Sequence, residues 1–402
     1  MLLSKIIYEP ENSLAYMERN VNNGSPSNFT FKNTTSKITN PLFVESYNIY
    51  IAYDYRCMFK AIGNVPNFKN IIIPENMDYV FIHPDLQCFN FTNTKELSFT
   101  VQPTSSFRTV RIKSSPYYLK LAYPKVLGRI TREIEHKNIY YSLEVNNILS
   151  DLVCKYDAPG QLSFLPEKSG KIYNFKDKEY GYIIRDVIPL GKNSNKILSL
   201  IPAFSLYSKD RLNDDFPIIV QLINNKKNKL DFLLNQLIFP VIDSYFYCVF
   251  SGGLQPEMHS QNFLIGLDNE LNICSIVLRD LESVDKDLTI MEQIGIETEF
   301  TSYPFKCIEK GQYNYYIKHS FMFDHKLCEY FFDPLIRCLS EFNYFEEKDI
   351  TKEIKNYVNS KYKNELLHFF PSDGKWYKFE NVVIDRTKTY RPYMTIDNPK
   401  YR

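Results

Sequence analysis

The sequence predicts an α+β fold, with a mainly antiparallel sheet and a helical C-terminal part. Short β-like runs recur at 41–112, where Pro, Asn and Asp separate them as in an antiparallel sheet. Helical patterns follow at 231–250, 315–342 and 347–369. The 402 residues can bury one large core or roughly two to three smaller ones. We expect three parts, which are a β-rich region at 1–100, a core at 101–290 and a helical region with closing strands at 291–402.

Composition and charge narrow the function classes. Lys and Arg (48) nearly balance Asp and Glu (47), so no overall field favours nucleic acid or an anionic membrane. No apolar run approaches the length of a membrane span, and the opening residues do not fit a signal peptide. The eight cysteines show no zinc spacing, and we expect buried, reduced thiols. We therefore expect a cytoplasmic protein with small-molecule partners and no nucleic-acid or membrane partner.

The first segment is polar and the next is rich in strands. Residues 1–40 contain many Asn, Ser and Thr, which favours a loop or a loosely held strand. The runs NIYIAY, NIIIP, DYVFIHP, LSFTVQP and RTVRIK then read as strands. Their recurrence at short spacing predicts a sheet of several antiparallel members.

Two neighbouring strands carry cationic and hydroxyl side chains. The first holds Ser106, Arg108 and Thr109, and the second, at 117–123, holds Lys120. Arginine and lysine on adjacent strands would form a cationic floor for a polyphosphate, and hydroxyls can donate to its oxygens. An ordinary charged hairpin face is the alternative interpretation.

Helices dominate the rest of the chain. One helix is expected to carry Arg129 and Arg132, and another is SLEVNNILSDLVCKY; YGYIIRDVI reads as a strand. The segment 231–250 repeats apolar residues at helical spacing, which predicts a buried helix, kinked near Pro240 and ended by two glycines. We expect it to support a site without doing chemistry. The tail, from about residue 374, reads as one or two strands.

The stretch from residue 252 to 280, GGLQPEMHSQNFLIGLDNELNICSIVLRD, is the strongest candidate for chemistry. It gathers Glu257, His259, Gln261 and Asn262, turns at residues 268–269, and ends at Asp280. Acids, an imidazole and amides suit a cation with phosphate oxygens, whereas burying them unpaired in a core is costly. We interpret this stretch as the metal and phosphate end of a nucleotide site.

Plainer interpretations exist for several of these residues. His259 alone fits a satisfied core histidine, and Glu257 fits a brace of its own loop. Asp280 fits an ion pair with the neighbouring Arg279. Arg185 fits a solvated position, because lone basic residues usually lie in solvent.

Four segments, taken in chain order, resemble the NRPS-independent siderophore (NIS) synthetases of the IucA/IucC, aerobactin-synthetase-like family. They are PTSSFRTV, YLKLAYPKVLGRITREI, GGLQPEMHSQNFLI and LRD. HPDLQ at 83–87 stands where that family usually has His-Pro-Trp-Gln, so a site role for His83 is the weaker interpretation. Only 105 residues precede Ser106, which is shorter than in the family, and the chain looks like an N-terminally shortened member.

The resemblance implies a cupped-hand fold with 101–290 as its palm, and an ATP- and Mg²⁺-dependent ligase. In that reaction a carboxylic acid, citrate or a related di- or tricarboxylate, is adenylated, and an amine or alcohol then displaces AMP to form an amide or ester. Siderophore biosynthesis and a homodimer are further expectations. The resemblance implies ATP contacts at Ser106, Arg108, Thr109, Lys120, Gln261 and Asn262, and metal ligands at Glu257, Asn262 and Asp280. It places the substrate carboxylate near Arg132, His259, Lys378 and Arg386. The implied catalytic residues are His259, Arg132 and Arg108.

Two other functions remain open. A small-molecule kinase would need a catalytic base where Gln261 stands, and an amide cannot accept that proton. The 13 glycines also form no GxGxxG loop. A degenerate, non-catalytic member that only binds a ligand or partner is the third possibility.

Overall fold

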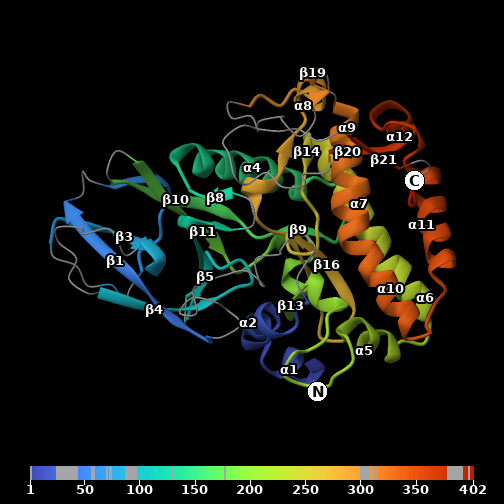
Figure 1. Ribbon diagram of the computed structural model, residues 1–402, viewed down its shortest axis with the longest axis horizontal. Coiled ribbons are helices and arrows are strands. Elements are labelled where there is room, and N and C mark those ends of the chain that lie inside the picture. Colours follow the sequence, from blue (N-terminus) through green and yellow to red (C-terminus); the bar gives the residue numbers. More distant parts are fainter. Residues whose placement is uncertain are drawn as a thin grey trace. The chain divides into compact units, whose positions relative to one another are not determined.

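The computed structural model consists of two compact units (Figure 1). Unit 1 comprises Met1–Ser27, Leu149–Phe164 and Gly191–Arg402, and unit 2 comprises Asn28–Ile148 and Leu165–Leu190. The structure describes residues 2–23, 44–55, 59–68, 71, 75–86, 97–113, 115–127, 130–175, 178–298, 308–309, 312–313, 315–377, 393–396 and 399–402. The predicted α+β class with a mainly antiparallel sheet is confirmed, and the expected three-part division stays a prediction.

Unit 2 is built on an eight-stranded sheet in the order β2-β10-β11-β6-β5-β4-β1-β3, and its recorded pairs are antiparallel. Apolar residues such as Val80, Leu119 and Ile183 belong to one buried cluster, which holds the sheet together. The strands are β1 Tyr47–Tyr55, β2 Phe59–Gly63, β3 Met77–Ile82, β4 Leu97–Pro103, β5 Thr109–Ile112, β6 Tyr117–Leu121, β10 Glu167–Phe175 and β11 Lys178–Asp186.

A short ribbon follows β6 where a helix was predicted. Strands β7 (Tyr123–Leu127) and β8 (Ile130–Arg132) pair antiparallel, so Arg132 ends a strand, and Arg129 lies outside the described residues. The prediction of a helix was wrong, because the β-branched residues on both sides of a glycine in VLGRIT favour a hairpin. Helix α4 begins only at His136 and runs to Cys154.

Unit 1 contains a five-stranded sheet in the order β12-β9-β16-β15-β13. The predicted hairpin is formed by β15 and β16, and the side chain of Asp268 accepts the backbone N–H groups of Glu270 and Asn272 in its turn. All six residues of β16 are buried. The strands are β9 Leu162–Phe164, β12 Leu190–Gly191, β13 Ser199–Pro202, β15 Phe263–Leu267 and β16 Ile273–Leu278.

The predicted buried helix precedes this hairpin. Its first part, η5 (Phe232–Ile238), has π-helical hydrogen bonds, and α7 (Phe239–Gly252) continues it through Pro240, which lacks the N–H that an α-helix interior needs. Gly253 ends the helix with a φ of 62°. We expected no apolar run as long as a membrane span, but the helical run Lys229–Gly252 is long and apolar enough to cross a membrane by length and composition. Of its most apolar 18-residue window, 67% is buried in the protein, as in a core helix.

The N-terminal residues are helical, so the predicted loop was wrong for this segment. Helices α1 (Leu2–Tyr8) and α2 (Pro10–Asn20) bury Leu3, Ile6 and Met17. These apolar residues recur at helical spacing, a signal that the many polar residues around them obscured. Most of the Asn- and Ser-rich stretch itself, residues 24–43, lies outside the described residues.

The C-terminal helices are confirmed. Around Pro334 the hydrogen bonding changes from π-type to α-type, and the helix does not end there. The tail forms a predicted strand pair, β20 (Gly374–Tyr377) with β21 (Tyr393–Ile396).

Of the five described cysteines that are free, four are buried as expected and Cys154 is exposed. The remaining elements are α5 Ile218–Asn224, α6 Lys229–Asp231, α8 Leu288–Gln293, α9 Tyr315–Ser320, η8 Phe321–Phe332, α10 Asp333–Glu341, α11 Glu347–Lys361, α12 Lys363–Phe369, β14 Leu254–Gln255, β17 Asp285–Lys286, β18 Ile308–Glu309, β19 Gln312–Tyr313, β20 Gly374–Tyr377, β21 Tyr393–Ile396, η2 Pro84–Leu86, η3 Ser194–Lys196, η4 Ala203–Leu206 and η6 Leu281–Ser283.

Candidate active site

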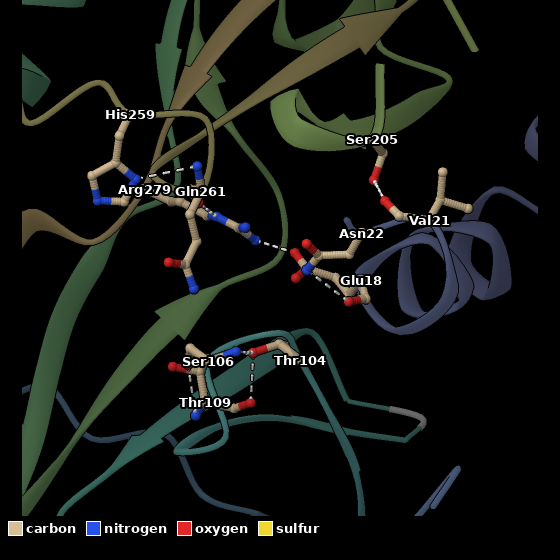
Figure 2. Close-up of polar contacts among 10 residues, drawn as sticks. All are labelled: Glu18, Val21, Asn22, Thr104, Ser106, Thr109, Ser205, His259, Gln261 and Arg279. Atoms are coloured by element: carbon tan, nitrogen blue, oxygen red, sulfur yellow. Dashed lines mark hydrogen bonds and ion pairs between the residues drawn. The ribbon is translucent and has the colours of Figure 1, made fainter. Parts of the chain in front are cut away.

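In unit 2, a tight turn at residues 104–109 leads into β5. Thr104 donates its backbone N–H and its hydroxyl to the carbonyl of Thr109, at 3.0 and 2.8 Å, and the Ser106 hydroxyl accepts the N–H of Thr109 at 3.2 Å (Figure 2). Ser106 and Arg108 were predicted on a strand, but they lie in this turn. The reason is Phe107, whose φ of 57° no strand can accommodate.

A buried aromatic and imidazole cluster supports the turn from within unit 2. The carbonyl of Phe107 accepts the hydroxyl of Tyr47 at 3.3 Å and lies 3.3 Å from Nε2 of His83. His83 in turn accepts the N–H of Asp85 and packs edge-on against the ring of Tyr123. The histidine of the altered HPDLQ motif therefore stands behind the turn and fixes its backbone.

Two cations lie beside this turn. The side chains of Arg108 and Lys120 are buried, and the register places Lys120 opposite Thr109 on the adjacent strand. The carbonyl of Arg108 also accepts the N–H of Leu121 at 2.8 Å, which locks the turn to β6. Buried cations are rare in proteins, so two of them beside a hydroxyl-rich turn favour an anion as the ligand.

The other basic residues that the sequence singled out have different surroundings. Arg185 is buried and not solvated, and its Nε donates to the buried carboxylate of Glu167 at 2.7 Å. Arg132 is partly buried at the end of β8, opposite Tyr123. Lys378 and Arg386 lie outside the described residues.

In unit 1, the polar loop between β14 and β15 is held by its own backbone. The carbonyl of His259 accepts the N–H of Asn262 at 2.8 Å, and its Nδ1 accepts the N–H of Gln261 at 3.3 Å. Since Nδ1 is an acceptor, the proton of the neutral ring is on Nε2, which faces a carboxylate oxygen of Glu257 at 4.0 Å. Burial lowers the pKa of His259 to about 4, although the charge of Glu257 opposes this change. The ring is therefore neutral near pH 7.

A lysine that the sequence analysis missed belongs to this loop's surroundings. Nζ of Lys326, on η8, lies 2.6 Å from the carboxylate of Glu257, and its side chain is only 13% exposed. The same ammonium lies over the rings of Phe321 and Tyr330. The segment around Lys326 reads simply as a helix, so only the folded chain reveals this contact.

The predicted metal ligands are fixed by contacts within unit 1. The amide of Asn262 donates to Ser283, whose hydroxyl donates to the carbonyl of Asp280, at 2.9 and 2.7 Å. Asp280 has a φ of 70°, and the Arg279 N–H donates to the carbonyl of Asn262. The Arg279 guanidinium forms an ion pair with Glu18 (Figure 2), and the alternative in which Asp280 also pairs with Arg279 stays open.

The three predicted metal ligands carry oxygen donors of the kind that Mg²⁺ prefers. Across the described part of the chain, no three His, Cys, Asp or Glu side chains form a group that could hold a metal ion. Glu257, Asn262 and Asp280 offer two carboxylates and one amide oxygen, which suits Mg²⁺ when phosphates and waters supply the other ligands. In the present state one of these carboxylates holds Lys326.

Solved structures share the fold of this chain. The petrobactin biosynthesis protein AsbB from Bacillus anthracis str. Sterne matches all of this chain over 78% of its own length, with a TM-score of 0.70 and 15% identity. The ATP-bound aerobactin synthetase IucA from a hypervirulent pathotype of Klebsiella pneumoniae has a TM-score of 0.61 at 12% identity, over 81% of this chain and 64% of its own. The synthetase IucC from the same pathotype gives 0.65 at 12%, over 83% and 65%.

One family model matches part of the sequence. The IucA / IucC family model matches residues 86–207. No curated protein matches the sequence. The chain spans a little less than two thirds of the two Klebsiella synthetases. The matched segment contains both the hydroxyl-rich turn at 104–109 and the strand that carries Lys120.

Proposed function

We propose that the chain is a member of the IucA/IucC family of NIS synthetases, and that it is an ATP- and Mg²⁺-dependent ligase that joins a carboxylic acid to an amine or alcohol. The observation that carries the proposal is the turn at 104–109 with its two buried cations, Arg108 and Lys120. A triphosphate matches this arrangement, because it offers several anionic oxygens to cations and hydroxyls at once.

The reaction has two steps that balance without a redox partner. A carboxylate oxygen of the acid attacks the α-phosphorus of ATP, the bond to the bridging oxygen breaks, and pyrophosphate leaves. The nitrogen or oxygen of the second substrate then attacks the acyl carbon, AMP leaves, and the nucleophile loses a proton. Carboxylate and triphosphate repel each other, so the site must supply positive charge and hold both groups in line.

Each group of residues then has a role. Ser106, Arg108, Thr109 and Lys120 would bind and orient the phosphates, with Gln261 and Asn262 as further contacts. Mg²⁺, when bound, would neutralise phosphate charge, and Glu257, Asn262 and Asp280 would hold it. Arg132 and neutral His259 would meet the substrate carboxylate or the phosphorus as charge builds there. Lys378 and Arg386 are additional proposed contacts to the acid.

We further propose citrate or a related di- or tricarboxylate as the acid, and siderophore biosynthesis as the pathway class. A polyanionic acid agrees with the number of cations assigned to the site. Cytoplasmic location and a homodimer complete the proposal.

Product analysis tests the reaction type directly. The protein is incubated with ATP, Mg²⁺ and a panel of di- and tricarboxylic acids, and pyrophosphate, AMP and ADP are measured. A ligase releases pyrophosphate only with its own acid, a kinase produces ADP, and a degenerate member produces neither. ADP formation or the absence of acid-dependent pyrophosphate would overturn the proposal.

A further inference from the structure

A contact that joins distant parts of the chain supports the polar loop of unit 1. Glu18 of helix α2 pairs with Nη1 of Arg279, and the two side chains are 2% and 10% exposed. The Nε of the same arginine donates to the carbonyl of Gln261 at 2.7 Å. Figure 2 shows this series of contacts from α2 through Arg279 to the loop that also carries His259.

Helix α2 is itself fixed where Glu18 emerges. The carbonyl of Val21, just after the helix, accepts the hydroxyl of Ser205 at 2.8 Å, and the carbonyl of Asn20 accepts the N–H of Arg211 at 2.8 Å. The hydroxyl of Tyr16 donates to Asp210. These bonds attach both sides of Glu18 to the segment after β13, so the carboxylate is held in place before it meets Arg279.

Two of the three guanidinium nitrogens are therefore engaged inside the protein. One nitrogen holds Glu18 and another holds the Gln261 carbonyl. Arginine presents its donors as a rigid planar fork, so fixing one edge orients the other. A buried arginine without its carboxylate would be an uncompensated charge, and the fork would lose its orientation.

We propose that Glu18 is a positioning residue for the nucleotide loop, acting through Arg279 on the backbone of Gln261 and thus on the adjoining Asn262. This inference rests on the proposed function, because it assigns the loop to nucleotide and metal binding. It also assigns a structural role to Arg279 in the Arg279-Asp280 pair.

Hydrogen exchange tests, without any substrate, whether the Glu18–Arg279 ion pair supports the loop; we call this support the brace. Exchange is measured for peptides that cover residues 256–264 in the wild type, in Glu18→Gln and in Glu9→Gln, which neutralises an exposed carboxylate just before the same helix. Glu18→Gln should speed exchange of the Asn262 amide about tenfold, the equivalent of one weakened charge-assisted hydrogen bond. Glu9→Gln should change nothing. Unchanged exchange in Glu18→Gln would overturn the brace.

Kinetics then test whether the brace matters to the reaction. Glu18→Gln should lower kcat for pyrophosphate release about tenfold while leaving KM for the acid unchanged, and Glu18→Asp should restore part of the rate because it keeps the charge. Equal rates for Glu18→Gln and wild type, despite faster exchange, would overturn the positioning role. If Glu18→Gln does not fold, Glu18→Asp serves in both measurements. A wild type that makes no pyrophosphate with any acid defeats the proposed function, and the exchange result still decides the brace.

Discussion

The turn at 104–109 and the loop at 257–262 are stabilised in different ways. The turn is closed by hydrogen bonds between residues at most five apart, and Tyr47, His83 and Leu121 reach it from elsewhere in unit 2. The loop depends on partners far along the chain, Glu18 and Lys326. The hydrogen bonds that close the turn are therefore mostly local, whereas side chains around the loop also form ion pairs with groups far along the chain.

This difference predicts how each region responds to mutation. A substitution in the turn should act on ligand contacts and on the local backbone. A substitution around the loop should also act from a distance, through side chains that touch no ligand. The predictions below follow from that contrast.

The largest effects are expected from one catalytic candidate in each region. Arg108→Ala and His259→Ala should each lower pyrophosphate release by about 10²- to 10³-fold, since each removes a group that stabilises developing charge. If the two regions serve one reaction, the double variant should lose little more than the worse single variant. Steady-state pyrophosphate assays measure this.

Lys113→Ala is a matched control for Arg108→Ala in the turn at 104–109. It removes an exposed cation just after β5, the strand that follows the turn. It should retain the wild-type rate. Circular dichroism should show that all variants keep the fold. Losses that multiply in the double variant would mean that the two regions contribute independently, and normal pyrophosphate release by either single variant would count against the assignment.

The next-largest effect is expected at Lys326, whose ammonium group forms an ion pair with Glu257, a carboxylate that we assign to Mg²⁺ binding. Lys326→Met should lower the Mg²⁺ concentration needed for half-maximal ATP binding about fivefold, because a partly buried ion pair worth about 1 kcal/mol no longer competes. Calorimetric titration of ATP at a series of Mg²⁺ concentrations measures it. Lys352→Met, at an exposed position of α11, is the control. A higher Mg²⁺ requirement would show that Lys326 assists the metal site.

The sequence specifies much of the fold and only part of the site. Short β-like runs separated by Pro, Asn and Asp predict the antiparallel sheet, and the apolar spacing at 231–250 predicts η5 and α7, because both patterns are local. The residues of the turn and loop are conspicuous by chemistry and spacing. Glu18 and Lys326 are not, since each is an ordinary charged residue within a helix until folding buries it against a partner 261 or 69 residues away.

Local composition also misled in two places. The segment 1–40 was judged by its many polar residues, and the few apolar ones that place α1 and α2 in the core were outweighed. Arg132 was placed on a helix, although the hairpin of β7 and β8 carries it. In both segments a local signal was outweighed: a few apolar residues at helical spacing in the first, and β-branched residues on both sides of a glycine in the second.

A smaller effect is expected from the support behind the turn. His83→Ala should reduce the free energy of unfolding by about 1–3 kcal/mol, because the N–H of Asp85 and the carbonyl of Phe107 lose a buried partner. ATP affinity should fall less than in Arg108→Ala, since the turn keeps its own hydrogen bonds. Urea unfolding measures the first change. His368→Ala, an exposed histidine, should leave stability unchanged.

The smallest effect concerns the buried pair that anchors the start of the polar loop. Nε2 of His319 lies 2.8 Å from the carboxylate of Asp287, whose N–H donates to the carbonyl of Gly253 at 2.7 Å. Burial lowers the pKa of His319, and the hydrogen bond with Asp287 opposes this change. Because the folded-state pKa lies below the unfolded one, the unfolded chain takes up the proton first as the pH falls. The contribution to stability is therefore full above about pH 6.5 and declines below it.

Replacing this imidazole by an amide separates its titration from its hydrogen bond. His319→Gln can still donate to Asp287 but has no proton to gain, so its unfolding free energy should fall less between about pH 7.5 and about pH 5.5 than that of the wild type. Urea unfolding at the two pH values gives the comparison, with His368→Gln expected to behave as wild type. Identical pH slopes for His319→Gln and wild type would show that the buried pair does not titrate between the folded and unfolded states.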